Sequence, residues 1–293
     1  VTAQLSWSGE INNMSQQPQA LPSAAVKPLV LDFESHGLDK HNDRKFITAL
    51  ARGLEVLRAF QSQVGRMSNK EISEITNIPK PSITRLTYTL RKMGYLQQNN
   101  EDRKYELSPG VLSLGYPLLS GLAVRHLAHD QMAELASSGG CSVALGARDR
   151  LSIVYVDECC GNSSTTLRLD IGARIEVARS SIGRAWLAGL GEEQRENIYE
   201  QLESVYANEW SDLKARAEDA IEQIHERGYC LVDQEWRKDT RTVAVPLVSA
   251  DGNTVMAISC GGPTFGVSVA VLEQELGPRL RHIGENISKF LGK

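Results

Sequence analysis

The stretch from Ser68 to Leu96 constrains the fold more than any other part of this 293-residue chain. Its first residue, together with Glu71 three positions later, matches the capping box that begins a helix. Asn77 tolerates the left-handed backbone conformation and Pro79 cannot continue a helix, so the pair predicts a tight turn. A second helix is expected to begin near Pro81, because proline is favoured in a first helical turn. The pattern is that of a helix-turn-helix.

The second of these helices is expected to have one apolar and one polar face. The expected core residues recur at helical spacing and are Ile83, Leu86, Leu90 and Met93. The opposite face carries residue types that contact bases and phosphates, namely Lys80, Ser82, Thr84, Arg85, Thr87, Tyr88 and Arg91. A helical hairpin with a solvated basic face is the alternative. The segments that follow favour a DNA-binding domain with a recognition helix.

Two short strands around a charged turn are expected directly after this helix. Gln97 to Asn100 leads into the turn 101–104, and Tyr105 begins the second strand. This is the wing of a winged helix-turn-helix, and Arg103 and Lys104 at its tip suit phosphate contact. Before the helix-turn-helix, a helix over residues 46–60 is expected to pack beneath it through residues three and four apart, which are Ile47, Leu50, Leu54, Leu57 and Phe60.

The distribution of charge separates two modules, although the net charge of the whole chain is only −4. Residues 44–104 contain 12 basic and 5 acidic side chains, a net charge of +7. Residues 105–293 contain 18 basic and 26 acidic side chains, a net charge of −8. A basic module followed by an acidic one suits a DNA-binding head on a sensing domain, and the overall acidity argues against a protein that compacts DNA without sequence preference.

Composition and motifs exclude several other classes. No apolar run approaches the roughly 20 residues of a membrane span, and the start of the chain shows no secretion signal, so a cytoplasmic protein without membrane contact is expected. Residues 1–42 are rich in Gln, Pro, Ser and Asn and are expected to be disordered. Motifs of phosphate-binding loops, dinucleotide folds, zinc proteases and serine hydrolases are missing, so we expect no catalytic residues, metal or cofactor.

Cysteines and histidines carry weaker alternatives. Five cysteines without a C-x-x-C pair argue against a disulfide framework or a zinc knuckle. The adjacent Cys159 and Cys160 could sense redox state, but ordinary reduced thiols are preferred. His126 and His129 are spaced to share a helix face and could hold a metal, yet no second pair of ligands accompanies them. We therefore interpret them as surface or interface histidines.

The remainder of the chain reads as two linking helices and an α+β domain. The helices are expected over about 111–122 and 124–137, and their apolar residues are interpreted as a dimer contact rather than core. Strands are expected at 141–147, 151–157, 165–169, 229–232, 242–248 and 254–259, and helices at 184–190, 192–201, 212–227 and 269–290, the last possibly broken at Gly277-Pro278. Strands mostly in hairpins predict an antiparallel sheet.

Several of these segments resemble the IclR family of transcriptional regulators. In the first half they are ALARGLEVLRAF, KEISEITNIPKPSITRLTYTLRKMGYL and YELSPGVLSLG, and in the second half they are SSIGRAWLAGL, ERGYCLVDQEW and TVAVPLVSADGNTVMAISCGGP. The resemblance runs from about Phe46 to Gly292. It implies a GAF-like effector-binding domain with an antiparallel sheet, and an effector that is a small organic acid or an aromatic catabolite.

An effector site is expected around Ser180, Ser181 and Gly183. Ser181 is a suitable N-cap for a helix over 184–190, and a helix start offers backbone N–H groups to an anion. Glycine at 183 would let a ligand approach the backbone, with Arg179 and Arg184 adding positive potential. The resemblance places Cys230, Asp233 and Glu235 on the opposite wall of this site. The alternative is an ordinary capped helix without a ligand.

The sequence therefore predicts a fold of the α+β class, with an N-terminal winged helix-turn-helix joined by a linker helix to the effector-binding domain. The expected limits are 1–42 for the tail, 43–107 for the DNA-binding domain, 108–124 for the linker and 125–293 for the effector domain. The expected function is effector-controlled regulation of transcription, with a double-stranded operator bound by a dimer or a dimer of dimers. A metabolite-binding, enzyme-like module with an accessory DNA-binding head is the alternative. Effector, operator and direction of regulation stay open.

Overall fold

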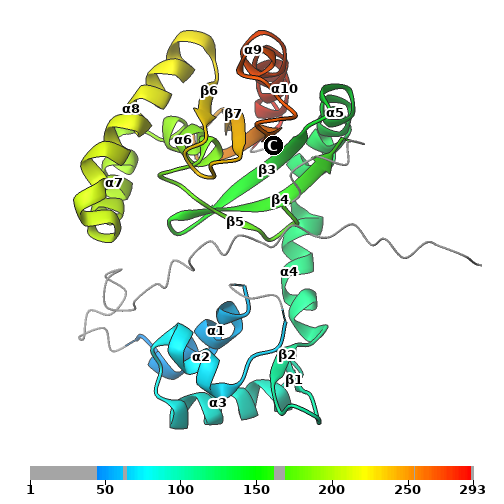
Figure 1. The fold of residues 1–293 in the computed structure, drawn as a ribbon, viewed down its shortest axis with the longest axis vertical. Coiled ribbons are helices and arrows are strands. Elements are labelled where there is room, and N and C mark those ends of the chain that lie inside the picture. Colours follow the sequence, from blue (N-terminus) through cyan, green and yellow to red (C-terminus); the bar gives the residue numbers. More distant parts are fainter. Residues whose placement is uncertain (1–44, 62–64, 162–168, 254, 292–293) are drawn as a thin grey trace, which may run out of the picture. The chain divides into compact units, whose positions relative to one another are not determined.

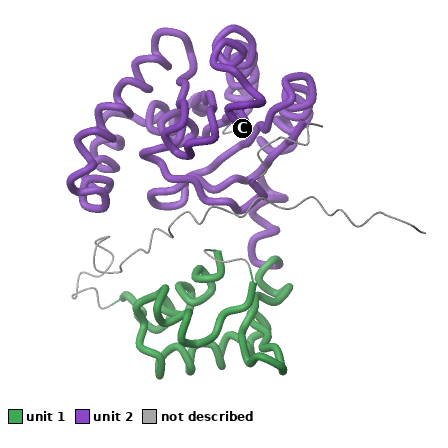
Figure 2. The backbone as a smooth tube through the Cα atoms, viewed as in Figure 1, with its two compact units in different colours: residues 1–112 green, residues 113–293 purple. Residues whose placement is uncertain are grey.

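The chain divides into two units, residues 1–112 and residues 113–293, in a computed structural model that describes residues 45–61, 65–161, 169–253 and 255–291 (Figure 2). The division falls within the segment expected to link two domains. The expected tail over 1–42 and most of the expected strand over 165–169 lie outside the described residues.

The first unit is the predicted winged helix-turn-helix. It comprises α1 (Thr48–Ala59), α2 (Asn69–Thr76), α3 (Lys80–Lys92) and the antiparallel strands β1 (Leu96–Gln98) and β2 (Tyr105–Leu107) (Figure 1). The capping box of Ser68 and Glu71 begins α2 as expected. Asn77 has a φ of 56°, so the left-handed turn is confirmed, and α3 begins at Lys80 with Pro81 in its first turn.

The core of this unit differs from the prediction at α1. Its buried residues are Val56, Ala59, Phe60, Met67, Ile72, Ile78, Ile83, Leu90, Leu96 and Tyr105. The first part of the expected α1 stripe faces solvent, because Ile47, Leu50 and Leu54 are 65%, 61% and 50% exposed. Its last two residues, Leu57 and Phe60, pack in the core as expected. In α3, Met93 is exposed rather than in the core, and Thr87 is buried rather than on the polar face. Val56 and Ala59 of α1 join Leu57 and Phe60 in the contact with the rest of the unit.

Helix α4 (Gly110–Gly121) spans the division between the units and contains no buried residue. Among the described residues, no single helix is long and apolar enough to cross a membrane. The pair of α4 and α5 (Ala123–Gly139) reaches that length and composition together, but the two helices are bent by 80°.

The second unit is built on one antiparallel sheet in the order β5-β4-β3-β8-β7-β6. Its strands are β3 (Ser142–Asp149), β4 (Ser152–Cys160), β5 (Arg174–Glu176), β6 (Cys230–Asp233), β7 (Thr240–Val248) and β8 (Val255–Pro263). The antiparallel sheet is confirmed. β5 was not predicted, since three residues give too short a pattern to be seen in the sequence.

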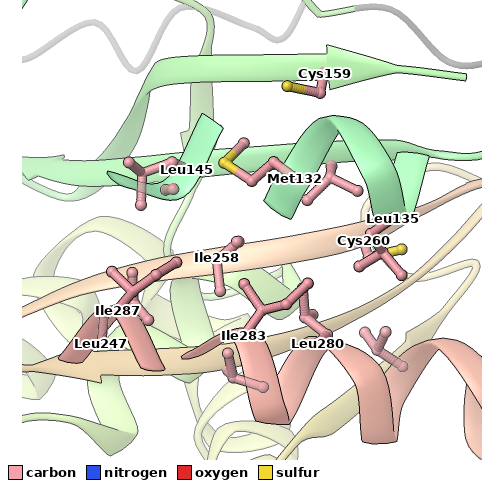
Figure 3. Close-up of a cluster of buried hydrophobic side chains, with 14 of the residues drawn as sticks. Met132, Leu135, Leu145, Cys159, Leu247, Ile258, Cys260, Leu280, Ile283 and Ile287 are labelled. Atoms are coloured by element: carbon pink, nitrogen blue, oxygen red, sulfur yellow. The ribbon is translucent and has the colours of Figure 1, made fainter. Parts of the chain in front are cut away.

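Helices cover both faces of this sheet. On one face, α5 and α10 (Gly277–Ser288) form the larger core, where Met132 and Leu135 meet Leu145, Ile258 and Leu280 (Figure 3). α6 (Ser181–Ala188) packs against β7 and β8 on the other face and is backed by α8 (Trp210–Arg227), which follows α7 (Glu192–Tyr206). The chain stays helical through Gly277-Pro278, where a break was considered: α9 (Val269–Val271) passes through a π-helical turn over Leu272–Leu276 into α10.

Candidate functional site

The exposed face of α3 carries most of the side chains that the sequence assigned to DNA. Lys80, Thr84, Arg85, Tyr88 and Arg91 are exposed, and Ser82 is half-buried. The guanidinium of Arg91 and the ammonium of Lys92 lie 5.9 and 5.8 Å from the centre of the Tyr88 ring. The helix thus presents a basic surface around one aromatic ring.

Asn69 at the start of α2 fixes α3 from the side. Its Nδ2 donates to Thr84 Oγ1 over 3.3 Å, and its Oδ1 lies 3.2 Å from Thr87 Oγ1. The Thr84 hydroxyl in turn donates to the Lys80 carbonyl over 3.0 Å. The Thr84 hydroxyl therefore already has two partners within the protein. The buried Thr87 is a packing residue and does not reach the surface.

Two of the cations that the sequence assigned to DNA, Lys104 of the wing and Arg91 of α3, already have partners within the protein. Lys104 Nζ lies 3.1 Å from Glu71 Oε1, and Arg91 Nη1 donates to Gln98 Oε1 over 2.8 Å. The backbone N–H and hydroxyl of Ser68, followed by Lys104, lower the pKa of Glu71 to about 2. Lys104 therefore carries its own counter-ion at neutral pH. Arg103, at the turn of the wing, has a φ of 59° and is exposed.

A small cavity lies between α6 and the sheet in the second unit. Its volume is about 30 Å³, which is room for one or two water molecules. Hydroxyl groups and apolar side chains line it together, and the lining residues are Tyr155, Ile175, Ser180, Ser181, Ile182, Val232, Trp236, Thr240, Thr242 and Ser259. Ser181 Oγ and Thr242 Oγ1 lie 2.6 Å apart within it.

The start of α6 corrects the expected role of two residues. Ser180, and not Ser181, is the N-cap: its hydroxyl accepts from the Gly183 N–H over 3.1 Å and donates to the Glu176 carbonyl over 2.6 Å. A Cβ on Gly183 would overlap the backbone of Val177. Glycine is therefore required for helix packing, and a leucine there would disturb the fold rather than block a ligand.

The three residues expected on the opposite wall do not line the cavity. Cys230 is fully buried, with its Sγ 3.6 Å from the Ser181 carbonyl, and burial raises the pKa of its thiol to about 12. Asp233 and Glu235 line a separate surface depression of about 430 Å³. Asp233 pairs with Arg241 over 3.0 Å, and Glu235 pairs with Arg184 over 2.7 Å. The expected wall is thus replaced by ion pairs.

Only Ser180 and Ser181 of the ten lining residues were among the predicted site residues. Five of the others carry a polar group, namely Tyr155, Trp236, Thr240, Thr242 and Ser259. A signal was present in β7 and β8, where polar hydroxyls alternate with the apolar side chains that face α10. Tyr155 lies on β4, and its phenol forms a side-chain hydrogen bond with Ser259. Burial raises the pKa of Tyr155 to about 12, so the phenol is neutral and can donate a hydrogen bond.

The histidines and cysteines do not form a metal site among the described residues. His129 Nδ1 lies 2.9 Å from Oδ2 of the buried Asp157, which Arg125 also approaches over 3.5 Å. Cys159 is buried, and burial raises the pKa of its thiol to about 11, which makes it a poor nucleophile.

A winged helix-turn-helix followed by a domain with a hydroxyl-lined cavity is the arrangement expected of a ligand-responsive transcriptional regulator. Family models support this class directly: the IclR helix-turn-helix domain matches residues 49–100, and the C-terminal domain of the bacterial transcriptional regulator IclR matches residues 117–289. The chain therefore belongs to the IclR family, and it is a DNA-binding transcriptional regulator with an effector-binding domain.

Individual proteins of known family are similar to this chain over most of their length. The chain is similar to the HTH-type transcriptional regulator TsaQ1/TsaQ2 of Comamonas testosteroni, with 32% identity over 82% of this chain and 87% of the relative. It is 28% identical to the Pca regulon regulatory protein of Pseudomonas putida, over 91% and 92% of the two chains. The crystal structure of an IclR-family regulator from Brucella abortus is similar with a TM-score of 0.75 and 42% identity, over 84% and 93% of the two chains.

Proposed function

We propose that the regulator binds a two-fold symmetric operator through the exposed face of α3, with Arg85 as the main base-reading residue. Arg85 is exposed on α3 and has no carboxylate within 4 Å among the described residues, so its guanidinium is available to pair with guanine. Lys80, at the first turn, is placed for a phosphate, and Ser82, Tyr88 and Arg103 are further candidates. A chromosomal operator also implies action in the cytoplasm.

Thr84 and Lys104 take more limited roles in this proposal. The Thr84 hydroxyl is engaged by Asn69 and the Lys80 carbonyl, so we expect its methyl group to contact a thymine methyl. Lys104 forms an ion pair with Glu71, so we expect it to contribute less to DNA affinity than Lys80 does. The orientation of α3 by Asn69 makes the whole face rigid before DNA binds.

Arg85→Ala is expected to cost about 1–3 kcal/mol in operator binding and to relax preference at one base pair. Lys80→Ala is expected to weaken binding to every sequence alike and to reduce the salt dependence by about one ion. The operator is first selected from a random duplex library, and affinities are then measured by fluorescence anisotropy at several salt concentrations. Lys289→Ala, which removes a lysine from the second unit, is the control. Unchanged affinity and preference in Arg85→Ala would contradict the assignment.

We propose further that the protein self-associates through exposed apolar surfaces of the helices before and after the DNA-binding core. Ile47, Leu50 and Leu54 form one such stripe on α1, at spacings of three and four. On α4, Leu112, Leu114, Tyr116 and Leu118 are 59–68% exposed. Apolar area of this kind is costly in water and is characteristic of a protein–protein contact. A symmetric dimer would present two α3 helices to a two-fold operator.

Leu50→Glu is expected to shift the sedimentation mass from an even oligomer toward the monomer, because it places a charge in the α1 stripe. The control is Met93→Glu, which also replaces an apolar side chain by glutamate, at the C-cap of α3, where Met93 is as exposed as Leu50. Analytical ultracentrifugation of the full-length chain measures both variants. If neither variant dissociates the oligomer, or if both dissociate it to the same extent, the proposal that α1 lies in the interface is wrong.

The effector proposed for the cavity is a compact acid or phenol with an apolar body. The hydroxyls of Ser181, Thr242, Tyr155 and Ser259 offer donors and acceptors at one end, and Trp236 with apolar side chains offers a flat wall. The first N–H groups of α6 have no partner within the helix, and their partial positive charge favours an acid over a neutral ligand. The hydroxyl cluster at the start of α6 carries this proposal.

Thr242→Val is expected to weaken binding of an aromatic acid about three- to tenfold, since it removes one hydroxyl without changing the side-chain volume appreciably. Calorimetry with benzoate, 4-hydroxybenzoate, pyruvate and neutral benzamide measures it, and the acids are expected to be recovered chemically unchanged. Thr264→Val, at the turn after β8 and outside the cavity, is the matched control. Equal affinities of wild type and Thr242→Val would place the ligand elsewhere.

A further inference from the structure

The cavity beside α6 is too small for the ligand that its chemistry suits. Its volume is about 30 Å³, whereas a cavity that holds benzene measures about 150 Å³. An aromatic acid can therefore enter only if one wall moves outward. The question is which wall can move.

One lining residue differs from all the others. Among the described residues that line the cavity, nine belong to a strand or to α6 and its cap, and only Trp236 comes from a loop. The nine are fixed by the regular hydrogen bonds of the sheet and the helix. Trp236 lies in the connection over residues 234–239 between β6 and β7. Displacement of this loop enlarges the cavity without breaking the sheet.

Hydrogen bonds inside the loop are few. The Gln234 N–H donates to the Thr240 carbonyl over 2.8 Å, and the Thr240 N–H donates to the Arg237 carbonyl over 3.2 Å. Gln234 has a φ of 59°, a conformation that a non-glycine side chain adopts at a cost. Arg237 and Asp239 pair with each other within the loop over 2.9 Å. The Thr264 N–H donates to the Asp239 carbonyl over 2.9 Å and joins the end of the loop to the segment after β8. None of these contacts joins the loop to α6.

Glu235, the neighbour of Trp236, supplies that tie. Its two carboxylate oxygens accept from Arg184 Nη1 over 3.1 Å and from Nη2 over 2.7 Å, which is the bidentate geometry of a strong pair. Arg216 of α8 adds a third bond of 3.1 Å to the same carboxylate. Burial by itself would raise the pKa of Glu235, but the two guanidinium groups outweigh it and leave that pKa below its ordinary value.

Arg184, the buried member of this network, cannot lose its carboxylate partner unless another hydrogen-bond acceptor replaces it. The side chain of Arg184 is 2% exposed, and its Nε also donates to the Ala178 carbonyl over 3.0 Å. An isolated buried guanidinium is strongly disfavoured, so Arg184 holds the Glu235 carboxylate close to α6. Arg216 is 48% exposed and also pairs with Asp212 of its own helix over 2.9 Å, so it can release the Glu235 carboxylate more easily. The Asp212 pair lies within α8 and does not reach the loop.

We propose that the Arg184–Glu235–Arg216 ion-pair network is a latch that holds the 234–239 loop, with Trp236, over the cavity. Glu235 is then a positioning residue that acts through Trp236 and does not touch the ligand. The latch sets how often the loop opens and therefore how fast a ligand is admitted. This inference rests on the effector proposal above, since it concerns access to the same cavity.

Arg216→Gln tests the latch without exposing a buried charge, because it removes only the outer of the two arginines. In the ligand-free full-length protein, amide hydrogen exchange of residues 234–240 is expected to rise about two- to fivefold, in keeping with one partly exposed ion pair. The association rate constant of 4-hydroxybenzoate, measured by stopped flow, is expected to rise by a similar factor. Asp239→Asn is the matched control, because its carboxylate pairs only within the loop.

Glu235→Gln is the stronger variant, with an expected increase of tenfold or more in both quantities where circular dichroism shows that it folds. An increase in the association rate separates the latch from general loosening, which would lower affinity without faster association. Unchanged exchange in Arg216→Gln, an equal change in Asp239→Asn, or faster exchange without faster association would each overturn the proposal. If 4-hydroxybenzoate does not bind at all, this choice of effector fails, and exchange of residues 234–240 alone decides whether the ion pairs hold the loop.

Discussion

The buried guanidinium of Arg184 is the interaction on which the architecture of the second unit depends. It joins three segments that are far apart in the sequence: the carbonyl of Ala178 before α6, the carboxylate of Glu235 after β6, and, through that carboxylate, Arg216 of α8. Removal of one partner from a buried ion pair typically costs about 3–5 kcal/mol, since the remaining charge is left without compensation. The same pair thereby fixes α6, whose start supplies two of the cavity hydroxyls, those of Ser180 and Ser181. The stability of this unit and the shape of the proposed effector cavity therefore have one physical origin.

The first unit depends on a different constraint, the orientation of α3 relative to α2. The capping box of Ser68 and Glu71 fixes where α2 begins, and the left-handed Asn77 fixes where it ends. Asn69, directly after the cap, then bonds to two threonines of α3. Glu71 also binds Lys104 of the wing, so one carboxylate connects the helix start with the wing. These bonds set the orientation of the exposed face of α3 relative to α2 and the wing.

Local sequence rules succeeded where the determining contacts are themselves local. The capping box, the Asn77 turn, the wing and the antiparallel hairpins all depend on residues a few positions apart, and each was predicted. The α1 stripe was right for Leu57 and Phe60 and wrong for Ile47, Leu50 and Leu54, because helical spacing identifies an apolar face but not whether that face meets the same chain. Gly183 was misinterpreted because the backbone of Val177, which requires the glycine, comes close only through the loop before α6. Glu235 was placed against a ligand because its arginine partners lie 51 and 19 residues away.

The most direct test is whether binding of an acid to the second unit and binding of the operator to the first unit change each other's affinity. The affinity of the full-length protein for its selected operator is measured by anisotropy with and without a saturating aromatic acid, and the affinity for the acid is measured by calorimetry with and without the operator. If the cavity controls DNA binding, the two measurements must give the same coupling factor, of the order of 5- to 150-fold, because coupling between binding sites is reciprocal. Saturation of the cavity with no change in operator affinity would contradict an effector-controlled regulator.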